Sequence, residues 1–152
     1  MKNWMWLLLA ALLLGVDQAS KLWALHALAP YQPLSLFPGV DLTLAFNSGS
    51  AFGFLSQSGS WHQLFFTCFS LVMSAGLVVW IAMTNPCAKL QLFALSLVLS
   101  GALGNVIDRL RLGYVIDFID VYVKTHHWPV FNIADSAICI GAFLLFCSTK
   151  DK

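Results

Sequence analysis

Long apolar segments dominate this chain and limit what it can fold into. A helix that crosses a bilayer needs about 20 mostly apolar residues. Four segments meet or nearly meet this requirement, the fourth being short: about 4–25, 61–83, 90–110 and 131–147. Charged residues make up 10% of the 152 residues, against about 25% in a typical soluble domain. We therefore predict an all-α membrane protein with four transmembrane helices, forming a single integral membrane domain over residues 1–152.

The first apolar segment also resembles a cleaved signal peptide. Lys2 precedes an apolar run that ends at Val16, and small residues follow at 27–29. However, Asp17 and Lys21 lie between the apolar run and the possible cleavage site. We therefore expect this segment to be a retained span.

The distribution of Lys and Arg predicts the orientation of the spans, because cytoplasmic segments are enriched in these residues. The long connection 26–60 has none, and the long connection 111–130 has Arg111 and Lys124. We expect both termini and the short turn 84–89 to be cytoplasmic and both long connections to lie outside. The basic residues on the predicted cytoplasmic side are Lys2, Lys89, Lys150 and Lys152.

Both long connections contain segments that favour β-structure. Residues 40–46 alternate between apolar and polar types, and residues 115–123 are rich in β-branched and aromatic side chains. We predict that these loops form a small extracytoplasmic sheet, a cradle seated on the outer ends of the helices.

Ionisable residues inside a span are functional candidates, because burying them in a bilayer is costly. Asp17 and Lys21 are four residues apart in the first span and share one helix face. They could instead form an ion pair that tethers this span to its neighbours. Asn105, Asp108 and Arg109 lie at the end of the third span, where Asp108 and Arg109 could form a simple interfacial charge pair.

The third span also carries small residues at four-residue spacing. Ser96, Ser100 and Gly104 would lie on one face of a helix, which favours close helix packing. Gly101 lies on the same stripe as Asn105 and Asp108.

The remaining candidates lie in the loops and at the start of the fourth span. Asn132 could cap that helix, with Asp135 in its first turn complementing the helix dipole. Asp117 lies in an apolar strand and could simply point to water. Asn47 and Gly49 could belong to an ordinary turn.

In the predicted topology all these polar residues fall at the outer leaflet, whereas the cytoplasmic side has only basic anchors. Structural polar residues alone would not gather on one side in this way. The residues that converge are Asp17, Lys21, Asn47, Asn105, Asp108, Arg109, Asp117, Asn132 and Asp135.

The composition excludes several kinds of chemistry. A zinc protease with an HExxH motif requires Glu, and the sequence has none. The histidines fall in loops or at span ends, and a Ser–Lys dyad using Lys21 lacks an identified serine. The four cysteines show no metal-ligand spacing. We predict no metal and no cofactor, and a net charge of +1 makes nucleic acid an unexpected partner.

Paired carboxylates remain as the candidate chemistry. Two Asp side chains held close together share a proton, so that one can activate water while the other protonates a scissile carbonyl oxygen. Asp135, at a helix N-terminus, should be the easier one to ionise, which leaves the proton on Asp117. A small transporter or proton-conducting subunit is the main alternative, because intramembrane carboxylates also form proton relays. The nearly apolar inner halves of the last three spans argue against such a relay.

Five segments in order resemble lipoprotein signal peptidase (signal peptidase II), a family of bacterial aspartic membrane proteases. The third-span motif of the family often begins with two glycines, and Ser100 stands here at the first. The resemblance extends over nearly the whole chain, and its matching segments are 17–21, 47–53, 101–109, 115–118 and 131–135.

This resemblance implies a function that the residues alone do not reveal. The family resides in the bacterial inner membrane and removes signal peptides from diacylglyceryl-modified prolipoproteins, cutting just before the lipid-bearing cysteine. Its catalytic pair corresponds to Asp117 and Asp135. We expect a monomer whose partners are these substrates and membrane lipid. The expected substrate-binding or supporting residues are Asn47, Gly49, Asn105, Asp108, Arg109, Asn132, Asp17 and Lys21.

Overall fold

The computed structural model describes residues 3–48 and 61–148, which form four helices and four strands. Three helices are long and apolar enough to cross a membrane, whereas the fourth has 16 residues. The chain is thus mostly helical, as predicted, with a small antiparallel sheet. The helices are α1 (Trp4–Ala27), α2 (Trp61–Met83), α3 (Lys89–Leu112) and α4 (Ile133–Ser148), and the strands are β1 (Leu34–Phe37), β2 (Val40–Asn47), β3 (Val115–Val123) and β4 (His126–His127).

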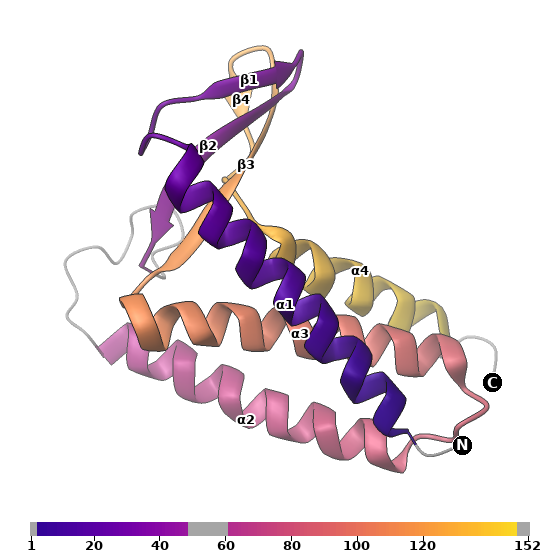
Figure 1. Ribbon diagram of the computed structural model, residues 1–152. Helices are drawn as coiled ribbons and strands as arrows, with labels where there is room; N and C mark the ends of the chain where they lie inside the picture. Colours follow the sequence, from indigo (N-terminus) through magenta and orange to yellow (C-terminus); the bar gives the residue numbers. More distant parts are fainter. Residues whose placement is uncertain (1–2, 49–60, 149–152) are drawn as a thin grey trace.

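The helices are arranged around α3, which packs against each of the other three. The beginning of α1, the turn between α2 and α3, and the end of α4 lie at one end of the molecule, and the sheet lies at the other (Figure 1). At the end away from the sheet, the Asn3 amide donates to Ile81 O at 2.8 Å and to Thr84 O at 2.7 Å. Asn3 thereby satisfies carbonyls that the end of α2 leaves free.

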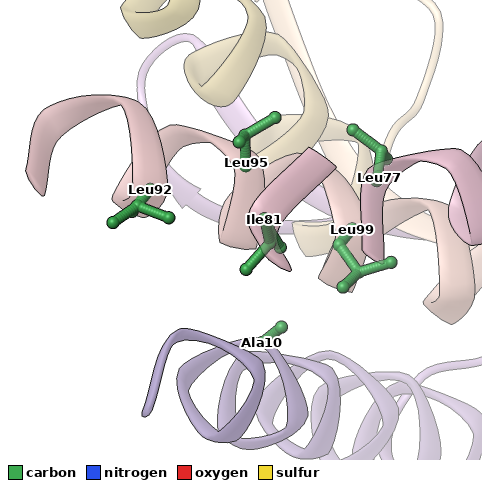
Figure 2. Packing of buried hydrophobic residues seen from close by; sticks show 6 residues of the cluster. All are labelled: Ala10, Leu77, Ile81, Leu92, Leu95 and Leu99. Carbon is green, nitrogen blue, oxygen red and sulfur yellow. The ribbon is translucent and has the colours of Figure 1, made fainter. Parts of the chain in front are cut away.

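Two apolar clusters hold the helices and the sheet together. Figure 2 shows Ala10 of α1 facing leucine and isoleucine side chains of α2 and α3 in the first cluster. The second cluster joins the end of α1 to β2 and β3 through Ala24, Leu44 and Ile116. The second cluster therefore fixes the sheet to α1.

Glycines allow α3 and α4 to approach closely. A Cβ atom on Gly101 of α3 would lie 2.3 Å from the carbonyl oxygen of Ala134 in α4. A Cβ atom on Gly141 of α4 would lie 2.8 Å from the carbonyl oxygen of Ala94 in α3. Only glycine fits at these positions, because real Cβ atoms do not approach a backbone oxygen so closely.

The sheet has the strand order β1-β2-β3-β4, with antiparallel neighbours. The predicted strands at 40–46 and 115–123 are confirmed as β2 and β3. Beyond β4 the chain returns to β3, where Phe131 forms a bridge with Ile119. This bridge delays the start of α4 to Ile133, two residues after the predicted start of the fourth span. The same bridge brings the start of α4 next to Asp117 on β3.

A destabilising pair of carboxylates lies elsewhere in this sheet. Asp41 and Asp120 are opposite each other on β2 and β3, and Asp41 Oδ1 is buried without a hydrogen-bond partner among the described residues. Like charges at directly opposite positions and unsatisfied buried oxygens both reduce stability. We expect Asp41→Asn to raise the free energy of unfolding by about 1 kcal/mol. Thermal unfolding in detergent measures this change, and a lower Tm would contradict it.

Candidate active site

The start of α4 is fixed by a reciprocal pair of hydrogen bonds. The backbone N–H of Asp135 donates to Asn132 Oδ1 at 2.9 Å, and the backbone N–H of Asn132 donates to Asp135 Oδ2 at 3.2 Å. This is a capping box in which Asn and Asp take the usual positions of Ser and Glu. The predicted capping role of Asn132 and Asp135 is therefore present. The capping bond also orients the Asn132 amide. Because Oδ1 accepts from the helix backbone, Nδ2 must point away from the helix.

The amide of Asn132 connects this helix start to Asp117 on β3. Asn132 is fully buried, and its Nδ2 donates to Asp117 Oδ1 at 2.7 Å. The other carboxylate oxygen of Asp117 accepts from Asn47 Nδ2 at 3.1 Å. Asp117 is 2% exposed, so it does not point to water.

The environment of Asp117 favours its protonated form. Burial, which removes water from the charged carboxylate, and the negative charge of Asp135 raise the pKa of Asp117 to about 7. The amide donors Asn47 and Asn132 and the charge of Lys21 oppose this rise. Asp117 can therefore hold a proton near neutral pH.

Asp135 has a different environment, although it shares Asn132 with Asp117. It is partly exposed, and its Oδ1 accepts from Asn105 Nδ2 at 2.8 Å. Its Oδ2 accepts the backbone N–H of Asn132 at the N-terminus of α4. Both oxygens thus accept hydrogen bonds close to the N-terminus of α4. Two neighbouring carboxyl groups in such different environments can act as an acid and a base.

A buried charged layer lies directly behind these carboxyl groups. Lys21 is 1% exposed and forms ion pairs with Asp17 at 3.0 Å and with Asp108 at 2.8 Å. Asp17 also accepts the backbone N–H of Ala134 at 2.9 Å, which ties α1 to the first turn of α4. Asp108 accepts the backbone N–H of Ile116 at 3.2 Å, which ties α3 to β3. The layer therefore fixes the two elements that carry Asp117 and Asp135.

Arg109 lies beside the carboxyl groups and not inside the charged layer. Its guanidinium carbon lies 5.9 Å from the centre of the Phe66 ring on α2. Its positive charge interacts with the carboxylates of Asp135, Asp108 and Asp117. Among the described residues, the ion-pair partner of Asp108 is Lys21 and not the adjacent Arg109. Asp108 therefore pairs with Lys21, which is distant in the sequence, in place of the pair with Arg109 considered from the sequence.

The structure brings together every predicted site residue except Gly49, which lies outside the described residues. It adds Gln18, which the sequence analysis did not single out. The Gln18 amide donates to Asp108 Oδ1 at 3.0 Å and to Gly104 O at 3.2 Å. The position of Gln18 between Asp17 and Lys21 could have marked it as a site residue. Its partners could not be predicted, because Asp108 is about 90 residues away in the sequence.

The four cysteines are free and lie exposed or half-buried. His127 bonds to Asp120 at 2.9 Å, in another part of the sheet. In the portions 3–48 and 61–148, no three His, Cys, Asp or Glu side chains are grouped so as to hold a metal ion. The candidate site consists of carboxyl, amide and basic side chains.

Fold and site together define a multi-pass membrane protein with a buried Asp and Asn network at the sheet end of its helices. The family model for signal peptidase (SPase) II matches residues 9–150, and the chain belongs to this family. A lipoprotein signal peptidase from Coxiella burnetii is 45% identical over 144 residues, covering 95% of this chain and 88% of that relative. One from Hydrogenovibrio crunogenus is 45% identical over 140 residues, covering 92% and 81%.

Solved structures agree with this assignment. A bacterial membrane enzyme determined by the in meso method at 2.3 Å has a TM-score of 0.82 at 30% identity, over 97% of this chain and 88% of that one. A second, determined at 1.9 Å, has a TM-score of 0.84 at 31% identity, over 95% and 92%. The resemblance to signal peptidase II seen in the sequence is confirmed, and the chain is a peptidase by family.

Proposed function

We propose that this peptidase removes signal peptides from diacylglyceryl-modified prolipoproteins by cutting just before the lipid-bearing cysteine. Membership of the signal peptidase II family supports signal-peptide removal, and relatives about 45% identical are named lipoprotein signal peptidases. The observation that carries the chemical proposal is the pair of carboxyl groups bridged by Asn132, one buried and one partly exposed.

In the proposed reaction Asp135 is ionised and Asp117 is protonated. Asp135 takes a proton from a water molecule, and the oxygen of that water attacks the scissile carbonyl carbon. Asp117 donates its proton to the carbonyl oxygen, which gives a neutral tetrahedral intermediate. Asp135 then returns a proton to the leaving nitrogen as the C–N bond breaks, and one hydroxyl group of the intermediate returns its proton to Asp117 as the new carboxyl group forms. No metal or covalent intermediate is needed.

The other polar residues have supporting roles in this proposal. Asn47, Asn105 and Asn132 donate hydrogen bonds that hold the two carboxyl groups in place. Arg109, whose charge interacts with the carboxylates, is proposed to contact the polar backbone of the substrate, and Gly49 belongs to the segment expected to contact it. Asp17, Lys21 and Asp108 hold the supporting elements together.

The proposed setting is the bacterial inner membrane, with α4 as a fourth span and one integral domain. In this orientation the termini and the α2–α3 turn are cytoplasmic and the sheet lies outside as a cradle for the signal peptide. A substrate with two acyl chains then reaches Asp117 and Asp135 sideways from the outer leaflet. The protein is proposed to act as a monomer.

The cleavage proposal is tested with the purified protein in lipid vesicles and a diacylglyceryl-modified prolipoprotein. Mass spectrometry should find a released peptide that ends at the residue before the modified cysteine. The same precursor without the lipid serves as the control and should be cleaved far more slowly. Cleavage at another bond, or equal cleavage of both precursors, would contradict the proposal.

The pH dependence follows from the protonation of Asp117. Because the reaction requires protonated Asp117, whose pKa is raised to about 7, activity should decline as pH rises through that value. Well above it, kcat/KM should fall about tenfold per pH unit. Initial rates on the lipid-modified precursor at fixed ionic strength measure this limb. A rate that stays constant to about two units above the pKa would rule out Asp117 as the acid.

A further inference from the structure

Lys21 is a buried charged residue that takes no chemical step in the proposed reaction. Its ammonium group has three N–H donors and no acceptor. All three donors are used: Asp17 Oδ2 at 3.0 Å, Asp108 Oδ2 at 2.8 Å and Asn105 Oδ1 at 3.0 Å. The two carboxylates already compensate its charge, so the bond to the neutral amide of Asn105 calls for a separate explanation.

The bond from Lys21 determines the orientation of the Asn105 amide. Asn105 Oδ1 accepts from Lys21 Nζ at 3.0 Å and from Asn132 Nδ2 at 3.2 Å. Because both partners are donors, Oδ1 must face them, and Nδ2 then faces Asp135 Oδ1 at 2.8 Å. A flipped amide would place its NH₂ group against the ammonium and its oxygen against the carboxylate, with both contacts repulsive.

We propose that Lys21 is a positioning residue for the peptidase reaction, acting through Asn105 to keep a hydrogen-bond donor on Asp135. This inference rests on the proposed function, and it assigns to Lys21 a role beyond structural support. The donor holds the Asp135 carboxylate in place to accept the proton of the attacking water. Lys21 thus orients the carboxyl group that acts as the base, without touching substrate.

Lys21 also acts on the second carboxyl group through its charge. Its positive charge lowers the pKa of Asp117, in opposition to burial and to the charge of Asp135. Removing this charge should therefore raise the pKa of Asp117 further. The pH at which activity declines should then move upward, because Asp117 stays protonated to a higher pH.

A single change at Lys21 would leave two buried carboxylates uncompensated and would damage the fold. The test therefore uses Lys21→Met together with Asp108→Asn, which keeps the net charge of Asp17, Lys21 and Asp108 at −1, as in the natural protein. Asp108→Asn alone is the reference for all other variants. Rates are divided by the concentration of folded protein, measured by thermal unfolding and circular dichroism.

A double-mutant cycle then distinguishes positioning from structural support. Relative to the Asp108→Asn reference, we expect Lys21→Met and Asn105→Ala each to lower kcat by about 10- to 100-fold. KM should change by less than about threefold. The variant with both changes should be no slower than the one with Asn105→Ala, because Lys21 acts through Asn105. Losses in kcat that multiply would overturn the proposal.

The pH profile provides a second readout that a purely structural role would not change. The decline in activity should lie at higher pH with Lys21→Met than in the reference, and Lys21→Arg in the natural background should keep the original profile. An unchanged decline with Lys21→Met would also overturn the proposal. If the proposed function itself were wrong, Asp135→Asn would retain activity whatever the outcome at Lys21. This result distinguishes failure of the proposed function from failure of the Lys21 proposal.

Discussion

Asp117→Asn and Asp135→Asn should each abolish cleavage of a lipid-modified precursor while the protein still inserts and folds. Asparagine keeps the size of each side chain and one of its two hydrogen-bond acceptors, but it can neither accept a proton from water nor donate one as an acid. We expect kcat/KM to fall at least about 10³-fold in each variant, because general acid–base groups contribute about 10²–10⁴-fold. Cleavage assays with equal amounts of folded protein measure the loss.

Stability provides a check on the Asp117→Asn variant. Because the pKa of Asp117 is raised to about 7 in the folded protein, folding opposes its ionisation. The resulting loss of stability develops as pH rises from the unfolded value of 3.8 to about 7. Asp117→Asn removes this cost and loses one hydrogen bond, so its Tm should stay close to that of the natural protein above neutral pH. Loss of activity then cannot be attributed to unfolding.

Asp120→Asn is the matched control for both variants. Asp120 lies on β3 like Asp117 and is also buried, but it bonds to His127 and Thr43. This variant should retain most of its activity, because Asp120 lies outside the network around Asn132. Substantial cleavage by Asp117→Asn or Asp135→Asn would exclude that residue from the catalytic pair.

Gly101→Ala should have the second largest effect, through packing alone. The added Cβ would lie 2.3 Å from the Ala134 carbonyl oxygen and 2.7 Å from an Ile138 side-chain carbon. Since backbone cannot move aside cheaply, α3 and α4 must separate. We expect a loss of about 3 kcal/mol in stability, at the upper end for overpacked sites. Activity should fall as well, because Asn105 on α3 and Asp135 on α4 would move apart.

Gly76→Ala on α2 is the control, since a Cβ atom there would meet nothing within 4 Å. Alanine favours helix over glycine by about 1 kcal/mol, so this variant should be no less stable than the natural protein. Gly101→Ala should therefore lower both the Tm and the cleavage rate, whereas Gly76→Ala should lower neither. Equal effects of the two substitutions would contradict the close approach of α3 and α4.

The helices and the two long strands were predictable because their signals are local. Apolar runs identified α1, α2 and α3, and β-branched residues identified β3. In contrast, β1 has four exposed residues with no alternating pattern, and it forms because β2 supplies its hydrogen-bond partners. The start of α4 shifted because Phe131 pairs with β3, which is a contact between elements and not a property of the apolar run.

The candidate site was predictable to a similar extent. The spacing of Asn132 and Asp135 indicated a helix cap, and that of Asp17 and Lys21 indicated a shared face. The pairing of Lys21 with Asp108 could not be derived, because it joins residues in different spans and depends on how α1 packs on α3. The catalytic roles of Asp117 and Asp135 stay predictions that rest on the family resemblance and the site geometry.

The shortness of α4 has a consequence for where the reaction takes place. Its 16 residues span about 24 Å, less than the roughly 30 Å thickness of a bilayer's hydrocarbon core. In the proposed four-span arrangement, either the bilayer thins beside α4 or the first turn of α4 lies below the headgroups. Both responses bring Asp135 close to the acyl chains, so a lipid-modified cysteine needs little displacement out of the leaflet. The hydrophobic mismatch of one helix thus links the depth of the reaction to the thickness of the membrane.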